Sequence, residues 1–116
     1  MKYDVVIIGA GPAGIFTALE LVRNGSDKKI LMVEKGKPVD KRHCPKAETG
    51  KCMNCKPNCM ITTGFSGAGA FSDGKLSLSC EVGGELPNLI GSEFAQELID
   101  YTDKIYLEFG ADEHVE

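Results

Sequence analysis

The sequence predicts an α/β fold built on a parallel β-sheet, and three observations support this prediction. Residues 3–9 and residues 28–36 are continuous apolar runs of the kind that forms strands buried on both faces of a sheet. Residues 11–25, between these runs, change to helical spacing. A strand, a helix and a second strand in this order form a right-handed crossover unit with parallel strands. We therefore expect residues 1–36 to form one β-α-β unit.

Each element of this unit carries its own local signal. The first strand, "YDVVIIG", is rich in β-branched residues and ends in glycine. In the helix "GPAGIFTALELVRNG", Ile15, Leu19 and Val22 lie along one stripe, and Gly25 is a suitable C-terminal stop. The second strand, "KKILMVEKG", repeats the buried pattern of the first.

The rest of the chain is predicted to contain three further segments. Residues 37–61 are polar and carry most of the cysteines, and we expect an ordered excursion there. Residues 62–90 begin with the glycine- and serine-rich loop "TTGFSGAGAFSDGK", and "LSLS" at 76–79 predicts a short strand. Residues 91–110 have the clearest helical pattern, with Ser92 as the expected N-cap.

The predicted helix over residues 91–110 has one apolar face, which indicates packing rather than chemistry. This face contains Phe94, Leu98, Ile105 and Phe109, and Gly110 follows as the stop. Two strong strands are few for a parallel sheet, because such a sheet needs both faces covered and usually has more strands. We therefore expect the chain to be an incomplete N-terminal segment of a larger domain, partnered by the remainder of its own polypeptide.

Composition and charge exclude several classes of partner. A net charge of −4 gives no electrostatic reason to expect nucleic acid or an anionic membrane surface. The apolar run at residues 5–19 is too short to span a bilayer, is interrupted by Gly-Pro and is followed by no cleavage site. We therefore expect a cytoplasmic location. In that compartment the five cysteines indicate metal or thiol chemistry rather than structural disulfides.

The clearest functional motif is G-x-G-x-x-G at residues 9–14, between the first strand and the helix. Gly9 permits a tight turn, Gly11 lets a pyrophosphate approach the backbone, and Gly14 lets helix and strand pack closely. The helix N-terminus supplies free N–H donors and a positive dipole for the phosphates. Glu34 ends the second strand, where an acid accepts hydrogen bonds from ribose hydroxyls. The pattern predicts a Rossmann-like fold that binds FAD or NAD(P).

The run "DVVIIGAGPAGIFTALEL…ILMVEKG" resembles the opening of FAD-dependent oxidoreductases of the glutathione-reductase-like superfamily. With "KRHCP", the cysteine cluster and "GFSGAGAFSDGKL", the chain as far as about residue 80 resembles a group of bacterial FAD-dependent dehydrogenases. The resemblance implies the FAD-binding segment of an oxidoreductase that is active as part of a longer chain. It implies FAD as cofactor, NAD(P)H as a candidate electron donor and a small-molecule substrate of unknown identity.

The resemblance also assigns cofactor contacts to four parts of the chain: the glycine motif, the acid after the second strand, the basic residues beyond it and the glycine-rich loop. The residues are Gly9, Gly11, Pro12, Ala13, Gly14, Glu34, Lys35, Arg42, Ser66, Gly67 and Gly69. The loop would run along the flavin side of the cofactor. Alternatively, the glycine-rich loop is a flexible turn without a role in cofactor binding.

Two other functions fit parts of the same sequence. "GAFSDGKL" at residues 69–76 matches G-x-x-x-x-G-K, but Leu76 stands where a phosphate loop needs Ser or Thr, and no buried strand leads into it. This argues against hydrolysis of nucleoside triphosphates. A non-catalytic module that senses NAD or FAD stays open, because both cofactors present the same ADP to the glycine motif.

The cysteines form the cluster Cys44-x₇-Cys52-x₂-Cys55-x₃-Cys59, for which three interpretations stay open. The four thiolates could bind zinc or an iron–sulfur cluster. Cys52 and Cys55 could form a redox couple in a flavin-linked thiol/disulfide oxidoreductase, although the C-x₄-C spacing of such enzymes is not present. The thiols could also be free. We expect Cys52, Cys55 and Cys59 to converge, with Cys44 as the fourth member, and no other residue is a candidate for catalysis.

Overall fold

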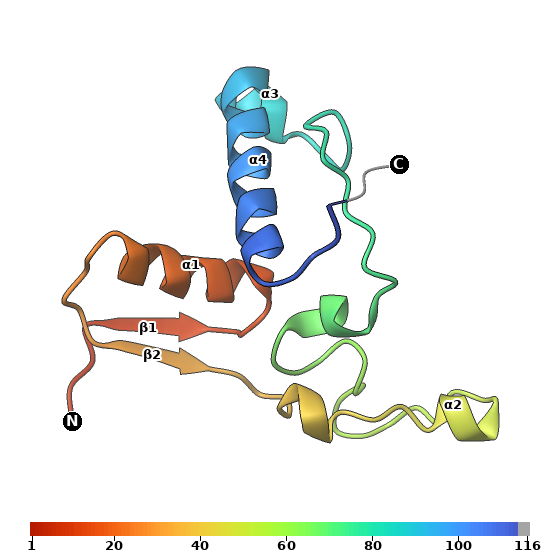
Figure 1. Ribbon diagram of the computed structural model, residues 1–116. Helices are drawn as coiled ribbons and strands as arrows, with labels where there is room; N and C mark the ends of the chain where they lie inside the picture. The colour runs from red at the N-terminus through yellow and green to blue at the C-terminus, as the bar shows by residue number, and fades with distance from the viewer. Residues whose placement is uncertain (114–116) are drawn as a thin grey trace. The chain divides into compact units, whose positions relative to one another are not determined.

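The structure is a computed structural model that describes residues 1–113, and these fall into two compact units. The first unit contains residues 1–74, and the second begins at residue 75 (Figure 1). Among the described helices, none combines the length and the apolar composition that crossing a membrane requires.

The first unit contains the predicted β-α-β arrangement. Strand β1 (Val5–Ile8) is followed by helix α1 (Pro12–Arg23) and strand β2 (Ile30–Val33). The strands are parallel, in a register that pairs Val5 with Ile30 at one end and Ile8 with Val33 at the other. The predicted α/β class with a parallel sheet is thus confirmed for this two-stranded sheet. Figure 1 shows α1 running alongside the two strands.

One face of this sheet is open among the described residues, so the prediction of strands buried on both faces is wrong for this chain. Ile7 faces α1, since a side chain on Gly14 would meet its Cγ2 atom. Alternation along the strand turns Val6 and Ile8 to the other face, where they are 54% and 80% exposed. The physical reason is that α1 covers one face only, and no other described element of the first unit covers the second.

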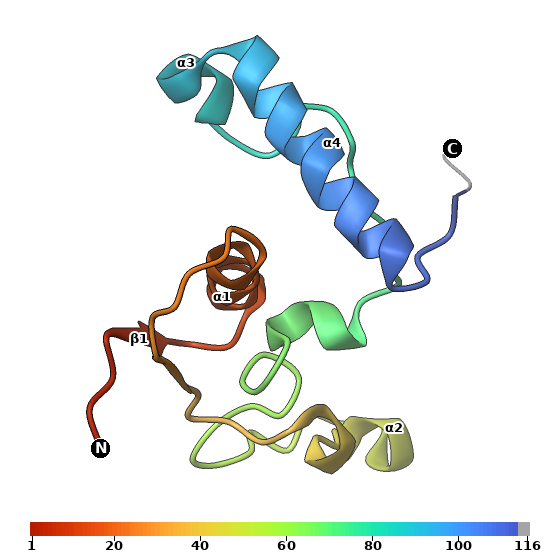
Figure 2. The ribbon, with the colours of Figure 1, turned by 60° about the vertical axis from the view of Figure 1, so that its left-hand side comes forward.

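Residues 37–74 form a long excursion that returns to the sheet. It contains a short 3-10 helix (Val39–Lys41), the single-turn helix α2 (Lys46–Thr49) and a second 3-10 helix (Gly67–Phe71). Both views show α2 projecting away from β1 and β2 (Figures 1 and 2). Lys37 and Gly64 form an isolated parallel bridge. The glycine-rich loop therefore runs beside the segment that leaves β2.

The second unit contains two helices, α3 (Leu86–Ile90) and α4 (Ser92–Glu108). Helix α4 and its end before Gly110 were predicted, and both are confirmed. Its predicted cap was wrong: Gly91, not Ser92, is the N-cap, with φ at +88° and no side-chain cap. The α3 turn was not predicted, although Pro87 in its first turn is a recognised helix-start signal.

The strand predicted at residues 76–79 is absent because it has no partner strand. A glutamine side chain of α4 takes that place: Gln96 Nε2 donates to the Leu78 carbonyl at 2.8 Å, and its Oε1 accepts from the Cys80 N–H at 3.0 Å. The predicted apolar face of α4 is only partly covered. Ile105 is buried, whereas Phe94 and Phe109 are 49% and 75% exposed.

Candidate functional site

The glycine motif forms a tight turn between β1 and α1. Gly9 has φ at +100°, a conformation that favours glycine, and its N–H extends the sheet by donating to the Val33 carbonyl at 2.7 Å. A Cβ on Gly14 would lie 2.0 Å from the Gly9 carbonyl oxygen, so the start of α1 packs directly against the turn. A Cβ on Gly11 would meet nothing within 4 Å. The turn is therefore closed at Gly14 and open at Gly11.

The open side of the turn is also the N-terminus of α1. Gly11 is the N-cap and Pro12 begins the helix, and no side chain caps this end. The N–H groups of Ala13 and Gly14 belong to the first helical turn and have no acceptor within the helix. Exposed N–H donors at the positive end of a helix dipole suit a phosphate. The residues present at this site therefore fit the pyrophosphate of a dinucleotide.

The peptide groups of Ala10 are held from two directions. The Ala10 N–H donates to Glu34 Oε2 at 2.9 Å, and the Ala10 carbonyl accepts from the Ser66 N–H at 2.8 Å. Ala10 itself is fully buried. One partner lies at the end of β2 and the other in the glycine-rich loop, so two segments distant in sequence fix the turn that would carry the phosphates.

Glu34 anchors the main chain with both carboxylate oxygens. Besides the Ala10 bond, its Oε1 accepts from the Gly36 N–H at 2.8 Å. These two bonds, Ala10 first, lower the pKa of the Glu34 carboxyl, and the neighbouring charge of Lys35 adds to the effect. The Glu34 contribution to the fold is therefore complete above the ordinary carboxyl pKa and is lost as the pH falls through the lowered value. A carboxylate offers about four acceptor sites, so Glu34 retains lone pairs for ribose hydroxyls.

Arg42 has a role different from the predicted contact beside the adenosine. Arg42 as a residue is 5% exposed, and its guanidinium donates to four main-chain carbonyls, those of Met60, Ile61, Phe65 and Gly67. A guanidinium committed to backbone carbonyls has few donors left for a ligand. Sequence spacing placed a basic residue near the acid, but only the returning loop supplies the acceptors that turn this side chain inward.

The glycine-rich loop reaches the glycine motif at two of its predicted residues. Ser66 donates to Ala10 from a left-handed conformation, with φ at +70°. A Cβ on Gly67 would lie 3.4 Å from Pro12 Cδ and 3.5 Å from Gly11 Cα. Gly69, in contrast, has open space around it. The structure thus brings Ser66 and Gly67 to the motif.

Two glycines outside the predicted site, Gly36 and Gly64, make this approach possible. A Cβ on Gly36 would lie 2.4 Å from Gly64 Cα and 2.5 Å from Gly64 N. Gly64 is buried, and a Cβ there would lie 2.6 Å from both Arg42 Cδ and the Lys37 carbonyl oxygen. A glycine two residues after the acid that follows β2 was the available signal for Gly36.

The four-cysteine arrangement predicted at Cys44, Cys52, Cys55 and Cys59 is not present. Within residues 1–113, no group of three or more His, Cys, Asp or Glu side chains is placed to hold a metal ion. All of these cysteines are free thiols, and the Cys52 sulfur lies 3.8 Å from the Asn54 side-chain oxygen. Asn54 is in a left-handed conformation, with φ at +48°, which redirects the chain between the cysteines. These residues therefore do not fit a zinc or iron–sulfur centre.

The Cys59 thiol should react at lower pH in the folded protein than in the unfolded one. Its pKa is lowered, chiefly by a hydrogen bond from the Thr62 backbone N–H, with a second from the Ile61 N–H. Because the thiolate is the nucleophile, iodoacetamide alkylation of Cys59 should reach half its maximal rate at a lower pH without urea than in urea. Mass spectrometry of the Cys59 peptide measures this. Equal midpoints in the two conditions would contradict the hydrogen bonding at Cys59.

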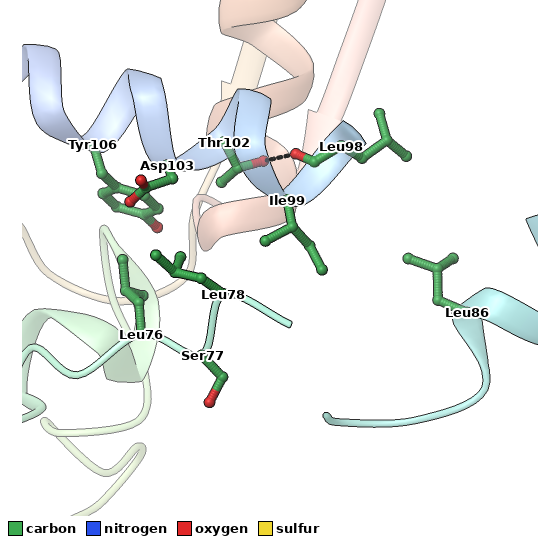
Figure 3. A pocket seen from close by; sticks show the side chains of 9 residues that line it. All are labelled: Leu76, Ser77, Leu78, Leu86, Leu98, Ile99, Thr102, Asp103 and Tyr106. Carbon is green, nitrogen blue, oxygen red and sulfur yellow. Dashed lines mark hydrogen bonds between the residues drawn. The ribbon is translucent and has the colours of Figure 1, made fainter. Parts of the chain in front are cut away.

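The second unit has a separate, apolar pocket with a volume of about 260 Å³. Figure 3 shows Leu76 and Leu78 turned toward α4 and Ser77 turned away. Residues 76–78 therefore keep a strand-like alternation without forming a strand. The Thr102 hydroxyl in the lining donates to the Leu98 carbonyl at 2.8 Å, and the lining contains one acid, Asp103, and no basic residue. Such a lining does not suit a phosphate-bearing cofactor.

Comparisons with known proteins agree with the site in the first unit. Residues 3–58 match the family model described as pyridine nucleotide-disulphide oxidoreductase. An uncharacterized protein of Clostridium beijerinckii is 44% identical over 77 residues, which are 66% of this chain and 14% of that protein. The mitochondrial electron transfer flavoprotein-ubiquinone oxidoreductase of Dictyostelium discoideum is 45% identical over 42 residues, 33% of this chain and 7% of that protein. No solved structure matches.

The match to the family model ends within the cysteine-rich excursion. The family match covers the β-α-β unit, Glu34 and the excursion as far as residue 58, and the chain spans only a small part of the length of the two relatives. The Rossmann-like fold predicted from the glycine motif is the one that this FAD-binding family implies. The resemblance of the N-terminal part of this chain to FAD-dependent oxidoreductases is therefore confirmed by its match to the pyridine nucleotide-disulphide oxidoreductase family.

Proposed function

We propose that this chain is the FAD-binding segment of a flavin-dependent oxidoreductase. The observation that carries the proposal is the turn at residues 9–14, which is open at Gly11, lies at an uncapped helix N-terminus and is fixed by Glu34 and Ser66. The match to an FAD-binding oxidoreductase family over residues 3–58 supports it.

The residues of this chain would bind and orient the cofactor. The N–H groups of Ala13 and Gly14 would donate to the pyrophosphate, and the free lone pairs of Glu34 would accept from ribose hydroxyls. Ser66 and Gly67 would form the neighbouring wall of the site, which leads toward the flavin. FAD, when bound, supplies the hydride and electron transfer itself.

We propose a dehydrogenase, located in the cytoplasm, that takes electrons from NAD(P)H or a small-molecule substrate and uses the remainder of its own chain to complete the site. The similarity to the electron transfer flavoprotein-ubiquinone oxidoreductase of Dictyostelium supports electron transfer as the reaction class. A metal has no step in this proposal, because no described group of three or more His, Cys, Asp or Glu side chains could hold one.

A titration with FAD tests the proposal against the sensor alternative. We expect the purified protein to bind FAD, to show a visible flavin absorbance band and to lose that band on reduction by NAD(P)H or dithionite. Because FAD and NAD both carry ADP, the glycine motif could bind either one. NAD is therefore titrated in parallel, and the two affinities are compared. Binding of NAD without any binding of FAD would overturn the proposal and favour a colourless nucleotide sensor.

Glu34→Gln should weaken FAD binding by roughly ten- to a hundredfold. The amide keeps one acceptor but turns an NH₂ group toward either the Ala10 or the Gly36 N–H, and the charge that favours ribose hydroxyls is lost. Fluorescence titration with FAD measures the change. Glu97→Gln makes the same substitution on the exposed surface of α4 and should bind FAD as the unmodified protein does. Equal affinity of both variants would reduce Glu34 to a purely structural residue.

A further inference from the structure

We propose that Arg42 is a positioning residue for the cofactor site: it holds residues 60–67 against the glycine motif and so sets FAD affinity without touching FAD. The inference rests on the proposed function. It differs from the sequence prediction, which placed Arg42 in contact with the cofactor. Arg42 forms four hydrogen bonds with the loop, and the loop contacts the glycine motif through Ser66 and Gly67.

The Arg42 guanidinium forms hydrogen bonds with both ends of the loop at residues 60–67. Its Nε donates to the Met60 carbonyl at 2.8 Å and its Nη2 to the Ile61 carbonyl at 2.5 Å. Its Nη1 donates to the Phe65 carbonyl at 2.7 Å and to the Gly67 carbonyl at 2.9 Å. The acceptors flank residues 62–64 on both sides. One side chain therefore closes the loop on itself.

The guanidinium is also stacked and enclosed. Its central carbon lies 4.7 Å from the centroid of the Phe71 ring, a cation–π arrangement. A Cβ on Gly64 would lie 2.6 Å from Arg42 Cδ and 2.7 Å from Nε, so the loop backbone passes directly over the side chain. Arg42 is the one buried charged residue among those described. A buried charge is tolerated only when its donors are used, and here main-chain carbonyls use them.

The held loop in turn supports the turn that would bind phosphate. Its Ser66 N–H donates to the Ala10 carbonyl at 2.8 Å, and its Phe65 N–H donates to the Lys37 carbonyl at 3.1 Å. Gly67 approaches Pro12 and Gly11. The contacts run from Arg42 through the loop to the peptide of Ala10. Release of the loop would remove one of the two hydrogen bonds that fix the main chain on either side of Ala10.

Lysine cannot replace Arg42 in this arrangement. Arginine presents five donors in a planar fork and stacks on an aromatic ring, whereas lysine presents three donors on one nitrogen. The four carbonyls accept from three different nitrogens, which a guanidinium has and an ammonium group does not. Arg42→Lys retains the charge and most of the volume, so it tests the fork itself. Arg42→Ala leaves space for a free guanidinium compound and permits chemical rescue.

The experiment compares Arg42→Lys and Arg42→Ala with Lys41→Ala, an exposed basic residue next to Arg42. Amide hydrogen exchange, measured without flavin, reports loop docking through the N–H groups of Phe65 and Ser66, with the amides of α1 as internal reference. Titration with FAD measures the affinity of each variant for the cofactor. Ethylguanidinium is then added to Arg42→Ala and to Lys41→Ala.

In both Arg42 variants we expect exchange at Phe65 and Ser66 to rise about tenfold or more, and FAD to bind roughly tenfold more weakly. The α1 amides should keep their protection. Ethylguanidinium should restore part of the affinity of Arg42→Ala and leave Lys41→Ala unchanged. A residue that merely stabilised the whole unit would lower the protection of α1 as well.

Unchanged loop protection in Arg42→Lys would overturn the inference, and so would lost protection with unchanged FAD affinity. If Arg42→Ala unfolds, with α1 protection also lost, Arg42→Lys decides the outcome. Failure of the unmodified protein to bind FAD would instead overturn the proposed function. The exchange measurement needs no flavin, so in that case it still decides whether Arg42 holds the loop.

Discussion

Gly11→Val should abolish FAD binding while the fold of the chain stays intact. A Cβ at Gly11 would meet nothing within 4 Å, and the residue has φ at −82° and ψ at −175°, which valine adopts readily. The branched side chain would instead occupy the space where a pyrophosphate must touch the backbone. We expect affinity to fall by about two orders of magnitude or more.

FAD titration and circular dichroism together measure the effect of Gly11→Val. The expected result combines lost flavin binding with an unchanged helical spectrum. The matched control is Ala47→Val, which adds the same branched side chain at an exposed position of α2, outside the proposed site. Flavin affinity in Gly11→Val equal to that of the unmodified protein would contradict the placement of the pyrophosphate at this turn.

Gly14→Ala should lower the stability of the first unit, whereas Gly11→Val should leave the fold intact. Alanine favours a helix over glycine by up to about 1 kcal/mol, which alone would stabilise α1. Its Cβ, however, would lie 2.0 Å from the Gly9 carbonyl oxygen and 3.2 Å from Ile7 Cγ2. A clash with backbone is relieved only if α1 moves away from β1, and overpacking typically costs about 1–3 kcal/mol, occasionally more. At so short a distance the clash outweighs the helix propensity.

Urea unfolding followed through NMR signals of α1 and β1 measures the cost of Gly14→Ala. Gly69→Ala is the control for stability, since its Cβ would meet no neighbour. We expect Gly14→Ala to unfold at a lower urea concentration than Gly69→Ala. Equal midpoints would show that helix and strand do not approach as closely as the structure indicates.

The elements predicted correctly depend on contacts that are local in sequence. The β-α-β unit follows from a change of apolar period between β1 and α1, and the turn between them from three glycines whose roles are set within six residues, 9–14. The Gly14 distance and the open space at Gly11 agree with the roles expected of those positions. Helix α4 was likewise predictable because its period and its glycine stop lie in one continuous segment.

Prediction failed where a residue's surroundings come from a distant segment. The sequence shows Arg42 as a basic residue eight positions after Glu34, but its acceptors Met60 and Gly67 follow 18 and 25 positions later. The "LSLS" segment alternates as a strand does, yet a strand needs a partner, and Gln96 supplies the hydrogen bonds instead.

By itself, then, the sequence determined the crossover unit, the glycine turn and the acid at the end of β2, because backbone conformation and short-range packing dictate each of them. Only the tertiary structure decided that Arg42 turns inward, that Ser66 reaches Ala10 and that the four clustered cysteines do not meet in a metal site. Nearness along the chain does not make side chains converge, since turns such as the one at Asn54 redirect the backbone between them. Side chains and carbonyls far apart in sequence come together only when the loop at residues 60–67 folds back onto the sheet.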